Sequence, residues 1–213
     1  SELAKTDVLI LCVKPTGLSN LLATLKKQNL PEKTLIISIV SGHMLNSMEA
    51  ALSQSNPVIR AMPNTPMMVG EAITVISPGT HVSENHLALA QAIFQQVGEV
   101  LDLDEQYLDA VTALSGAGPA YVYLMMEALA DGGVRVGLPR DVALKLVCQT
   151  MKGASAMVQQ LGRHPAALRD DVTTPAGCTI GGLLVMEDGK IRSTLARAVE
   201  EATNIASHLG DRS

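Results

Sequence analysis

The pattern of apolar residues changes near Leu103–Asp104, and this change constrains the fold more than any other feature of the chain. Before it, short apolar runs alternate with stretches of helical spacing, such as Leu18, Leu21, Leu22 and Leu25. The expected strands are Val8–Val13, Thr34–Val40, Val58–Met62, Ala72–Ile76 and Val100–Leu103. Strands that alternate with helices predict right-handed crossovers and a mostly parallel sheet.

After Leu103 the pattern is helical throughout. The expected helices are Pro119–Arg135, Val142–Leu161, Gly177–Met186 and Ile191–Leu209. In the first of these, Glu127, Asp131 and Arg135 are four residues apart, so the helix is polar along one stripe and is expected to be buried on its other faces. We therefore predict an α/β domain over residues 1–103 and an all-α domain over residues 104–213.

Composition excludes several classes of protein. Apolar residues make up 47% of the chain, aromatic residues 2% and charged residues 17%. We therefore expect an aliphatic core, and a surface that is largely buried either within the chain or against copies of it. The net charge of −5 and the scarcity of aromatic side chains argue against nucleic-acid binding. The longest uncharged run, Ala110–Met126, is broken by Gly116, Gly118 and Pro119 and is too short for a membrane span.

The cysteines indicate neither a disulfide framework nor a metal site. Cys12, Cys148 and Cys178 are odd in number and widely separated, and the five histidines show no ligand spacing. We expect Cys12, in a strand, and Cys148, in a helix, to pack as small apolar side chains. Because Ser1–Lys5 does not have the pattern of a signal peptide, the expected location is the cytoplasm.

The ends of three predicted strands carry groups suited to a ligand. A parallel sheet binds ligands outside the carboxyl ends of its strands. A cation and a rigid turn follow the first strand in Val13-Lys14-Pro15, and small residues follow the second in Val40-Ser41-Gly42. Asn64 supplies an amide after the third strand. These residues predict a cofactor site, although a solvated lysine and a plain turn remain alternatives.

The glycine-rich loop of a dinucleotide-binding fold is not found ahead of the first strand. The nearest match, Gly116-Ala117-Gly118, lies between helices and predicts a helix–helix turn rather than a phosphate loop. Thr173–Thr179 precedes a helix whose first N–H groups suit a carboxylate, with an N-cap threonine as the alternative. Glu105 reads as a first-turn acid, and His164-Pro165 as a capped turn.

Taken together, four segments closely resemble pyrroline-5-carboxylate reductase, and the resemblance runs along essentially the whole chain. The segments are Arg60–Pro66, Leu114–Tyr121, Ala128–Val134 with Gly137–Arg140, and His164–Ile180. The resemblance implies a Rossmann-type domain followed by an all-helical dimerisation domain. It also implies reduction of Δ1-pyrroline-5-carboxylate to L-proline, the last step of proline biosynthesis, with NADPH or NADH. The implied assembly is a homodimer through the helical domain, extended to a ring of dimers such as a homodecamer.

The resemblance also implies roles for individual residues. The positions that match cofactor contacts are Val13, Lys14, Pro15, Val40, Ser41 and Asn64, with Asp171 reaching the cofactor from the partner's helix. The positions that match substrate contacts are Glu105, Thr174, Ala176, Gly177, Cys178 and Thr179. Thr179 is the catalytic candidate, because its hydroxyl is expected to hydrogen-bond the imine nitrogen while the loop holds the carboxylate.

The sequence departs from the family at two places. Ala117 stands where the family commonly has Ser. The opening strand and the G-x-G-x-x-G loop are expected before Ser1, so the chain is either a fragment of a longer product or a protein without the phosphate cradle. For either case the sequence predicts a folded dimer with little reductase activity.

Two other functions compete with this interpretation. A β-hydroxyacid dehydrogenase needs a lysine facing the substrate from the long helix, where Lys145 and Lys152 are available. A non-catalytic oligomerisation module would use only the apolar helices of the second half.

Overall fold

The computed structural model describes residues 2–28, 30–52 and 55–209. The chain forms two compact units, and each is described by itself. The first unit extends to Pro119 and takes in the chain from Ala198 onward, and the second comprises Ala120–Arg197.

The first unit alternates strands and helices, as the sequence predicts. Its strands are β1 (Val8–Leu11), β2 (Leu35–Ser38), β3 (Val58–Met62), β4 (Ala72–Pro78) and β5 (Gly98–Asp102). Its helices are α1 (Pro15–Lys27), α2 (Leu45–Leu52), α3 (Glu84–Gln95) and α4 (Leu108–Val111), with 3-10 turns η1 (Glu2–Lys5), η2 (Thr65–Val69) and η3 (Glu105–Tyr107). The π-helical turn η4 (Thr112–Gly116) follows α4.

The five strands form one sheet in the order β1-β2-β3-β4-β5. All neighbours are parallel except β3 and β4, which pair antiparallel with Arg60 opposite Ser77. The prediction of a mostly parallel sheet is therefore confirmed. The connection from β3 to β4 holds only η2, which is too short for the crossover that a parallel pair requires.

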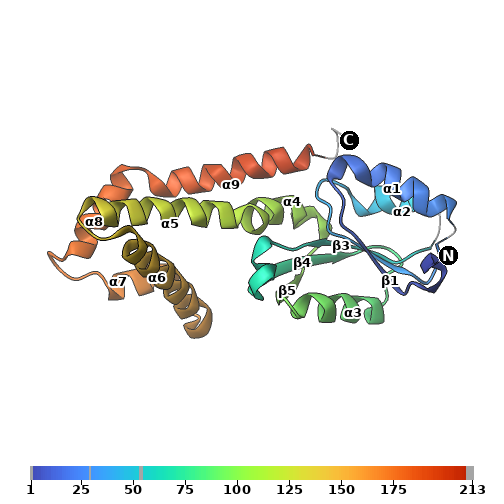
Figure 1. The fold of residues 1–213 in the computed structure, drawn as a ribbon, viewed down its shortest axis with the longest axis horizontal. Coiled ribbons are helices and arrows are strands. Elements are labelled where there is room, and N and C mark those ends of the chain that lie inside the picture. The colour runs from blue at the N-terminus through green and yellow to red at the C-terminus, as the bar shows by residue number, and fades with distance from the viewer. Residues whose placement is uncertain (1, 29, 53–54, 210–213) are drawn as a thin grey trace. The chain divides into compact units, whose positions relative to one another are not determined.

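Helices cover both faces of this sheet, with α1 and α2 on one face and α3 on the other (Figure 1). The predicted face of α1 is confirmed, because Leu18, Leu22 and Leu25 are buried against the sheet. On the other face, Ala90 and Phe94 of α3 pack on β2, β3 and β4. The core is aliphatic, and Phe94 is its one aromatic member among the described residues.

The second unit is built from helices, as predicted. They are α5 (Gly118–Arg135), α6 (Arg140–Leu161), α7 (Pro165–Asp171), α8 (Cys178–Asp188) and the start of α9 (Ile191–Ser207), which belongs to the first unit from Ala198 onward. Gly162 ends α6 with a φ of 61°, a conformation that favours glycine. Pro139 is the N-cap of α6, which begins at Arg140, two residues before the predicted start at Val142.

The expected burial of the Pro119–Arg135 helix is not reached within one chain. Ala130 is the buried residue of α5, whereas Tyr123 and Leu124 are 59% and 66% exposed. Within the described ranges, none of the helices combines the length and the apolar character needed to cross a membrane. The apolar faces of α5 thus lie on the surface of the single chain.

The expectation that Cys12 and Cys148 pack as small apolar side chains is wrong. Cys12, Cys148 and Cys178 are free and exposed. Cys12 follows β1 rather than lying within it, and Cys148 lies on α6 with its side chain exposed.

Candidate functional site

Three of the predicted cofactor segments follow neighbouring parallel strands. Leu11 of β1 pairs with Ser38 of β2, and Ser38 pairs with Arg60 of β3. The segments that begin at Val13, Val40 and Asn64 therefore leave the sheet at the same edge, which is where ligands bind in sheets of this kind.

The start of α1 has N–H groups without a side-chain cap. Lys14 is its N-cap and Pro15 its first residue, and the structure gives Lys14 no side-chain capping bond. The Lys14 side chain is exposed. A helix N-terminus beside a lysine attracts anions, so these residues suit a phosphate-bearing cofactor.

The loop between β2 and α2 is fixed to this helix start. Gly42 turns the loop with a φ of 80°, a conformation open to glycine. The next residue, His43, makes a hydrogen bond of 2.9 Å between its Nε2 and the carbonyl oxygen of Pro15. The bond holds the half-buried Ser41 and the start of α1 in one local arrangement.

Both polar atoms of the Asn64 side-chain amide form hydrogen bonds with the backbone of the protein. Its Oδ1 accepts from the Ile73 N–H at 3.0 Å, and its Nδ2 donates to the Ser115 carbonyl at 3.2 Å. The side chain thereby ties the start of β4 to the π-helical turn. Local sequence patterns do not indicate this role, because Ile73 and Ser115 are nine and fifty-one residues away from Asn64 in the chain.

The glycine-rich segment at Leu114 connects two helices, as the sequence predicts, but it does so through a π-helical turn. It forms η4, in which the Ala117 N–H donates to the Thr112 carbonyl at 2.8 Å, and it leads from α4 into α5. A Cβ on Gly116 would lie 2.9 Å from Met62 Cε, the flexible end of a side chain of β3, so the turn lies close to β3. Widened turns of this kind often occur at functional sites.

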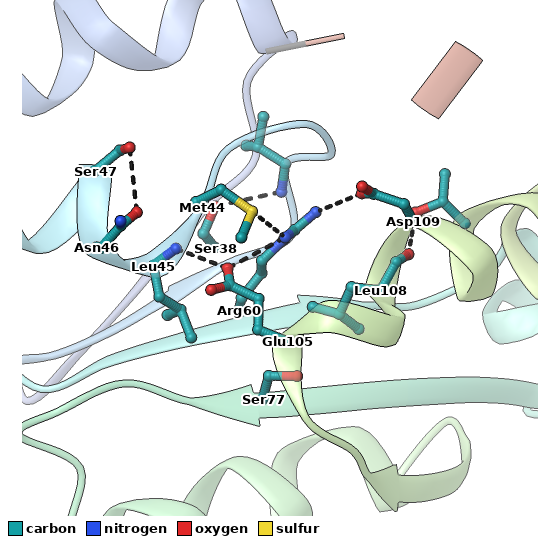
Figure 2. A network of polar contacts seen from close by, with 12 residues as sticks. Ser38, Met44, Leu45, Asn46, Ser47, Arg60, Ser77, Glu105, Leu108 and Asp109 are labelled. Carbon is teal, nitrogen blue, oxygen red and sulfur yellow. Dashed lines mark hydrogen bonds and ion pairs between the residues drawn. The ribbon is translucent and has the colours of Figure 1, made fainter. Parts of the chain in front are cut away.

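A buried arginine lies beside the same edge of the sheet. Arg60 of β3 is 3% exposed, and its guanidinium lies between the carboxylates of Glu105 and Asp109 (Figure 2). The Glu105 Oε1 also accepts from the Leu45 N–H at 2.7 Å. Glu105 is the first residue of η3, but its carboxylate caps α2, a helix much earlier in the chain.

The predicted carboxylate loop lies in the second unit, ahead of α8. The Gly177 N–H donates to the Thr174 carbonyl at 3.1 Å, and Ala176 between them has a φ of 57°. The N-cap of α8 is Gly177, which lacks a capping side chain, so the expected alternative of an N-cap threonine is wrong. A Cβ on Gly177 would lie 2.5 Å from Thr174 Oγ1, and this contact favours glycine there.

The first N–H groups of α8 lie ahead of the helix's own hydrogen bonds. They belong to Cys178, whose side chain is exposed, and Thr179, whose side chain is half-buried. The loop therefore offers backbone donors and a threonine hydroxyl at one helix start, an arrangement that suits a carboxylate.

Asp171, the last residue of α7, is paired within the second unit. Its Oδ2 accepts from Arg163 Nη1 at 2.5 Å. That hydrogen bond, reinforced by the charge of Arg163, lowers the pKa of Asp171 and raises the pKa of Arg163. The predicted turn at His164 is confirmed, since its Nδ1 accepts from the Ala166 N–H at the start of α7.

The structure brings together some of the predicted site residues and assigns others to a different unit. The first unit contains Val13, Lys14, Pro15, Val40, Ser41, Asn64 and Glu105, and the second contains Asp171, Thr174, Ala176, Gly177, Cys178 and Thr179. In the described part of the chain, no group of three or more His, Cys, Asp or Glu side chains is arranged to hold a metal ion.

Residues 105–209 match a family model described as pyrroline-5-carboxylate reductase dimerisation. The pyrroline-5-carboxylate reductase of Schizosaccharomyces pombe is 46% identical over 97% of this chain, which covers 73% of that protein. The chain belongs to the pyrroline-5-carboxylate reductase family. The reductase of Arabidopsis thaliana is 45% identical over 96% of the chain and 74% of its own length.

Solved structures agree with this assignment. A Plasmodium falciparum pyrroline carboxylate reductase with NADP bound superposes with a TM-score of 0.91, at 33% identity, over 98% of this chain and 79% of that one. The predictions of the family, of the Rossmann-type and helical fold, and of an NAD(P)H-dependent oxidoreductase are therefore confirmed. These matches do not support the alternative of a β-hydroxyacid dehydrogenase.

Proposed function

We propose that this protein reduces Δ1-pyrroline-5-carboxylate to L-proline with NADPH or NADH, as the last step of proline biosynthesis. The observation that carries the proposal is the 46% identity to a pyrroline-5-carboxylate reductase along nearly the whole chain. The arrangement of three strand ends at one edge of a parallel sheet supports it independently.

The proposed cofactor contacts are Val13, Lys14, Pro15, Val40, Ser41 and Asn64, with Asp171 contributed by the partner subunit. The uncapped start of α1 and the exposed Lys14 suit the phosphates of a dinucleotide. Small residues after β2 allow a cofactor to approach the backbone closely. Bound there, the nicotinamide supplies the hydride that the imine carbon receives.

The proposed substrate contacts are the residues of the loop that starts α8, whereas Glu105, which the resemblance also assigns to the substrate, is bonded to Leu45 and Arg60 in this structure. The N–H groups of Cys178 and Thr179 donate hydrogen bonds to the carboxylate. The Thr174 hydroxyl and the Ala176–Gly177 turn complete the carboxylate-binding site. Fixing the substrate in one orientation lowers the activation barrier more than proton donation does, by up to about 7–11 kcal/mol in favourable cases.

Thr179 is proposed as the catalytic residue. Its hydroxyl donates a hydrogen bond to the ring nitrogen, which gains or keeps a proton as the carbon is reduced. Proton donation of this kind typically contributes about 10²–10⁴-fold to a rate.

Substitution of Thr179 tests the proposal. We expect Thr179→Ala to lower kcat for pyrroline-5-carboxylate by roughly tenfold or more, because the hydrogen bond to the nitrogen is lost. Thr179→Ser keeps the hydroxyl and should retain most of the activity. Steady-state measurement of NADPH oxidation provides the readout, and an unchanged kcat in Thr179→Ala would remove the residue from the mechanism.

The helical part of the chain belongs to a dimerisation family, and the protein forms homo-oligomers. We propose that dimers assemble further into a ring such as a homodecamer, and that the enzyme acts in the cytoplasm. The family model begins at residue 105, which supports a domain boundary between residues 103 and 104. Native mass spectrometry separates a dimer from a decamer, and cell fractionation tests the location.

A further inference from the structure

Arg60 is the only buried charged side chain in the part of the chain that the structure describes. Its Nη1 lies 3.2 Å from Glu105 Oε1 and 3.6 Å from Met44 Sδ, and its Nη2 lies 3.3 Å from Asp109 Oδ1. Moving a charge out of water costs several kcal/mol, so a buried arginine needs partners of this kind. Carboxylates from η3 and α4 thus meet a cation from the middle of the sheet (Figure 2).

Glu105 connects this cation to the helix that follows β2. The same Oε1 that faces Arg60 accepts from the N–H of Leu45, the first residue of α2, at 2.7 Å. Figure 2 shows the Glu105 carboxylate between the Arg60 guanidinium and the Leu45 nitrogen. One carboxylate oxygen therefore fixes both the arginine and the start of α2.

The loop of residues 39–44 is consequently held at both ends. Its first end continues β2, and its second end is the Leu45 N–H bound to Glu105. Between them, His43 bonds the Pro15 carbonyl, which begins α1. The two bonds fix the two segments that the proposed function assigns to the cofactor, around Lys14 and around Ser41.

We propose that Arg60 and Glu105 are positioning residues that hold the loop of residues 39–44 in the shape that binds the nicotinamide cofactor. The inference rests on the proposed function. Arg60 orients the Glu105 carboxylate, Glu105 fixes the start of α2, and the loop before α2 carries the buried Val40 and the half-buried Ser41. Neither side chain needs to touch the cofactor for this role.

Asp109 offers a matched control within the same cluster. Its carboxylate also pairs with Arg60, but the structure gives it no bond to α2. Asp109→Asn therefore disturbs the charge around Arg60 while leaving the connection from Glu105 to Leu45 in place. A loss of cofactor binding caused only by weaker electrostatics would appear in this variant as well.

The experiment compares Arg60→Lys, Glu105→Ala, Glu105→Gln and Asp109→Asn with the unsubstituted protein. NADPH binding is measured by fluorescence titration, and amide exchange of residues 39–45 by mass spectrometry. We expect Arg60→Lys and Glu105→Ala to raise the Kd for NADPH about tenfold, as loss of one hydrogen bond to a charged group predicts. In both variants, amides 39–45 should exchange faster, whereas Glu105→Gln, which keeps an oxygen for Leu45, should recover most of the protection.

The two readouts separate this proposal from the proposed function. Amide exchange needs no cofactor, so unchanged protection of residues 39–45 in folded Glu105→Ala and Arg60→Lys overturns the positioning role even if the reductase assay succeeds. A change in Glu105→Ala confined to the KM for pyrroline-5-carboxylate also overturns it, since Glu105 would then contact the substrate. An equal loss of NADPH binding in Asp109→Asn overturns it as well. Failure of the unsubstituted protein to bind NADPH, with faster exchange in the variants, contradicts the proposed function alone.

Discussion

Ala176 has a left-handed backbone conformation, with a φ of 57°, at the third position of the Thr174–Gly177 turn. This conformation costs a residue with a Cβ about 1–2 kcal/mol, and glycine avoids the cost. Glycine also makes the unfolded chain more flexible, and the additional entropy lost on folding offsets roughly 0.4–1 kcal/mol of the gain. We expect Ala176→Gly to raise the free energy of unfolding by about 0.5 kcal/mol, measured by urea denaturation.

Ala154 provides the control for this prediction. It is exposed in the interior of α6, where the backbone is helical and glycine is unfavourable. Ala154→Gly should lower the free energy of unfolding by roughly 1 kcal/mol. If both substitutions destabilise the protein, the conformation of Ala176 stores no strain that glycine can release.

At the residue scale, the sequence predicted a residue's place in its own element better than its contacts. Glu105 was expected at a helix start and is found at one, but its carboxylate binds the N–H of Leu45, sixty residues earlier. Local patterns contain no information about such a partner. Arg60 itself could have indicated this contact, because an arginine in the middle of an apolar strand requires a carboxylate from another part of the chain.

Among the helices, the ion pair of Arg163 and Asp171 joins the chain after α6 to the end of α7. The hydrogen bond from Arg163 lowers the pKa of Asp171. A carboxyl whose pKa is lower in the folded state stabilises the fold above its unfolded pKa, and this contribution disappears as the pH falls through the folded value. We expect Asp171→Asn to lower the denaturation midpoint at pH 7 and to have a progressively smaller effect below pH ~4.

Salt and a neighbouring residue test this explanation. Both side chains are solvent-exposed, so added salt should also reduce the effect of Asp171→Asn at pH 7. Asp170 pairs with Arg169 inside α7 and links no second element, so Asp170→Asn should change the midpoint less. An effect of Asp171→Asn that is independent of pH would show that the ion pair is not its cause.

Periodicity predicted the elements because each depends on a local pattern of burial. The strand Val58–Met62 is found with the predicted bounds, and the helix predicted from Leu18 and its neighbours is α1. The strand predicted over Val8–Val13 ends at Leu11, although Cys12 and Val13 continue the apolar run. The π-helical turn at Thr112–Gly116 was not predicted, since it depends on close approach to Met62 across the fold.

For the whole molecule, the low content of charged residues agrees with the exposed apolar side chains on the helices of the second unit. Tyr123 and Leu124 of α5 and Leu144 of α6 line an open apolar groove. Single exposed leucines are common in monomers, but a contiguous apolar surface indicates an interface. Because residues 105–209 match a dimerisation family, a second copy of the chain is the expected occupant.

A charge placed on this surface should therefore separate the subunits. We expect Leu124→Asp to weaken dimerisation by about 2 kcal/mol, roughly thirtyfold in Kd, because the aspartate would be buried without a partner. Leu89→Asp on α3 is the matched control, since Leu89 is 42% exposed on the first unit and should leave the dimer intact. Sedimentation velocity over a range of concentrations gives the Kd for each variant. Equal dimerisation of Leu124→Asp and the unsubstituted protein would mean that the subunits meet through another surface, and the exposure of α5 would then lack an explanation.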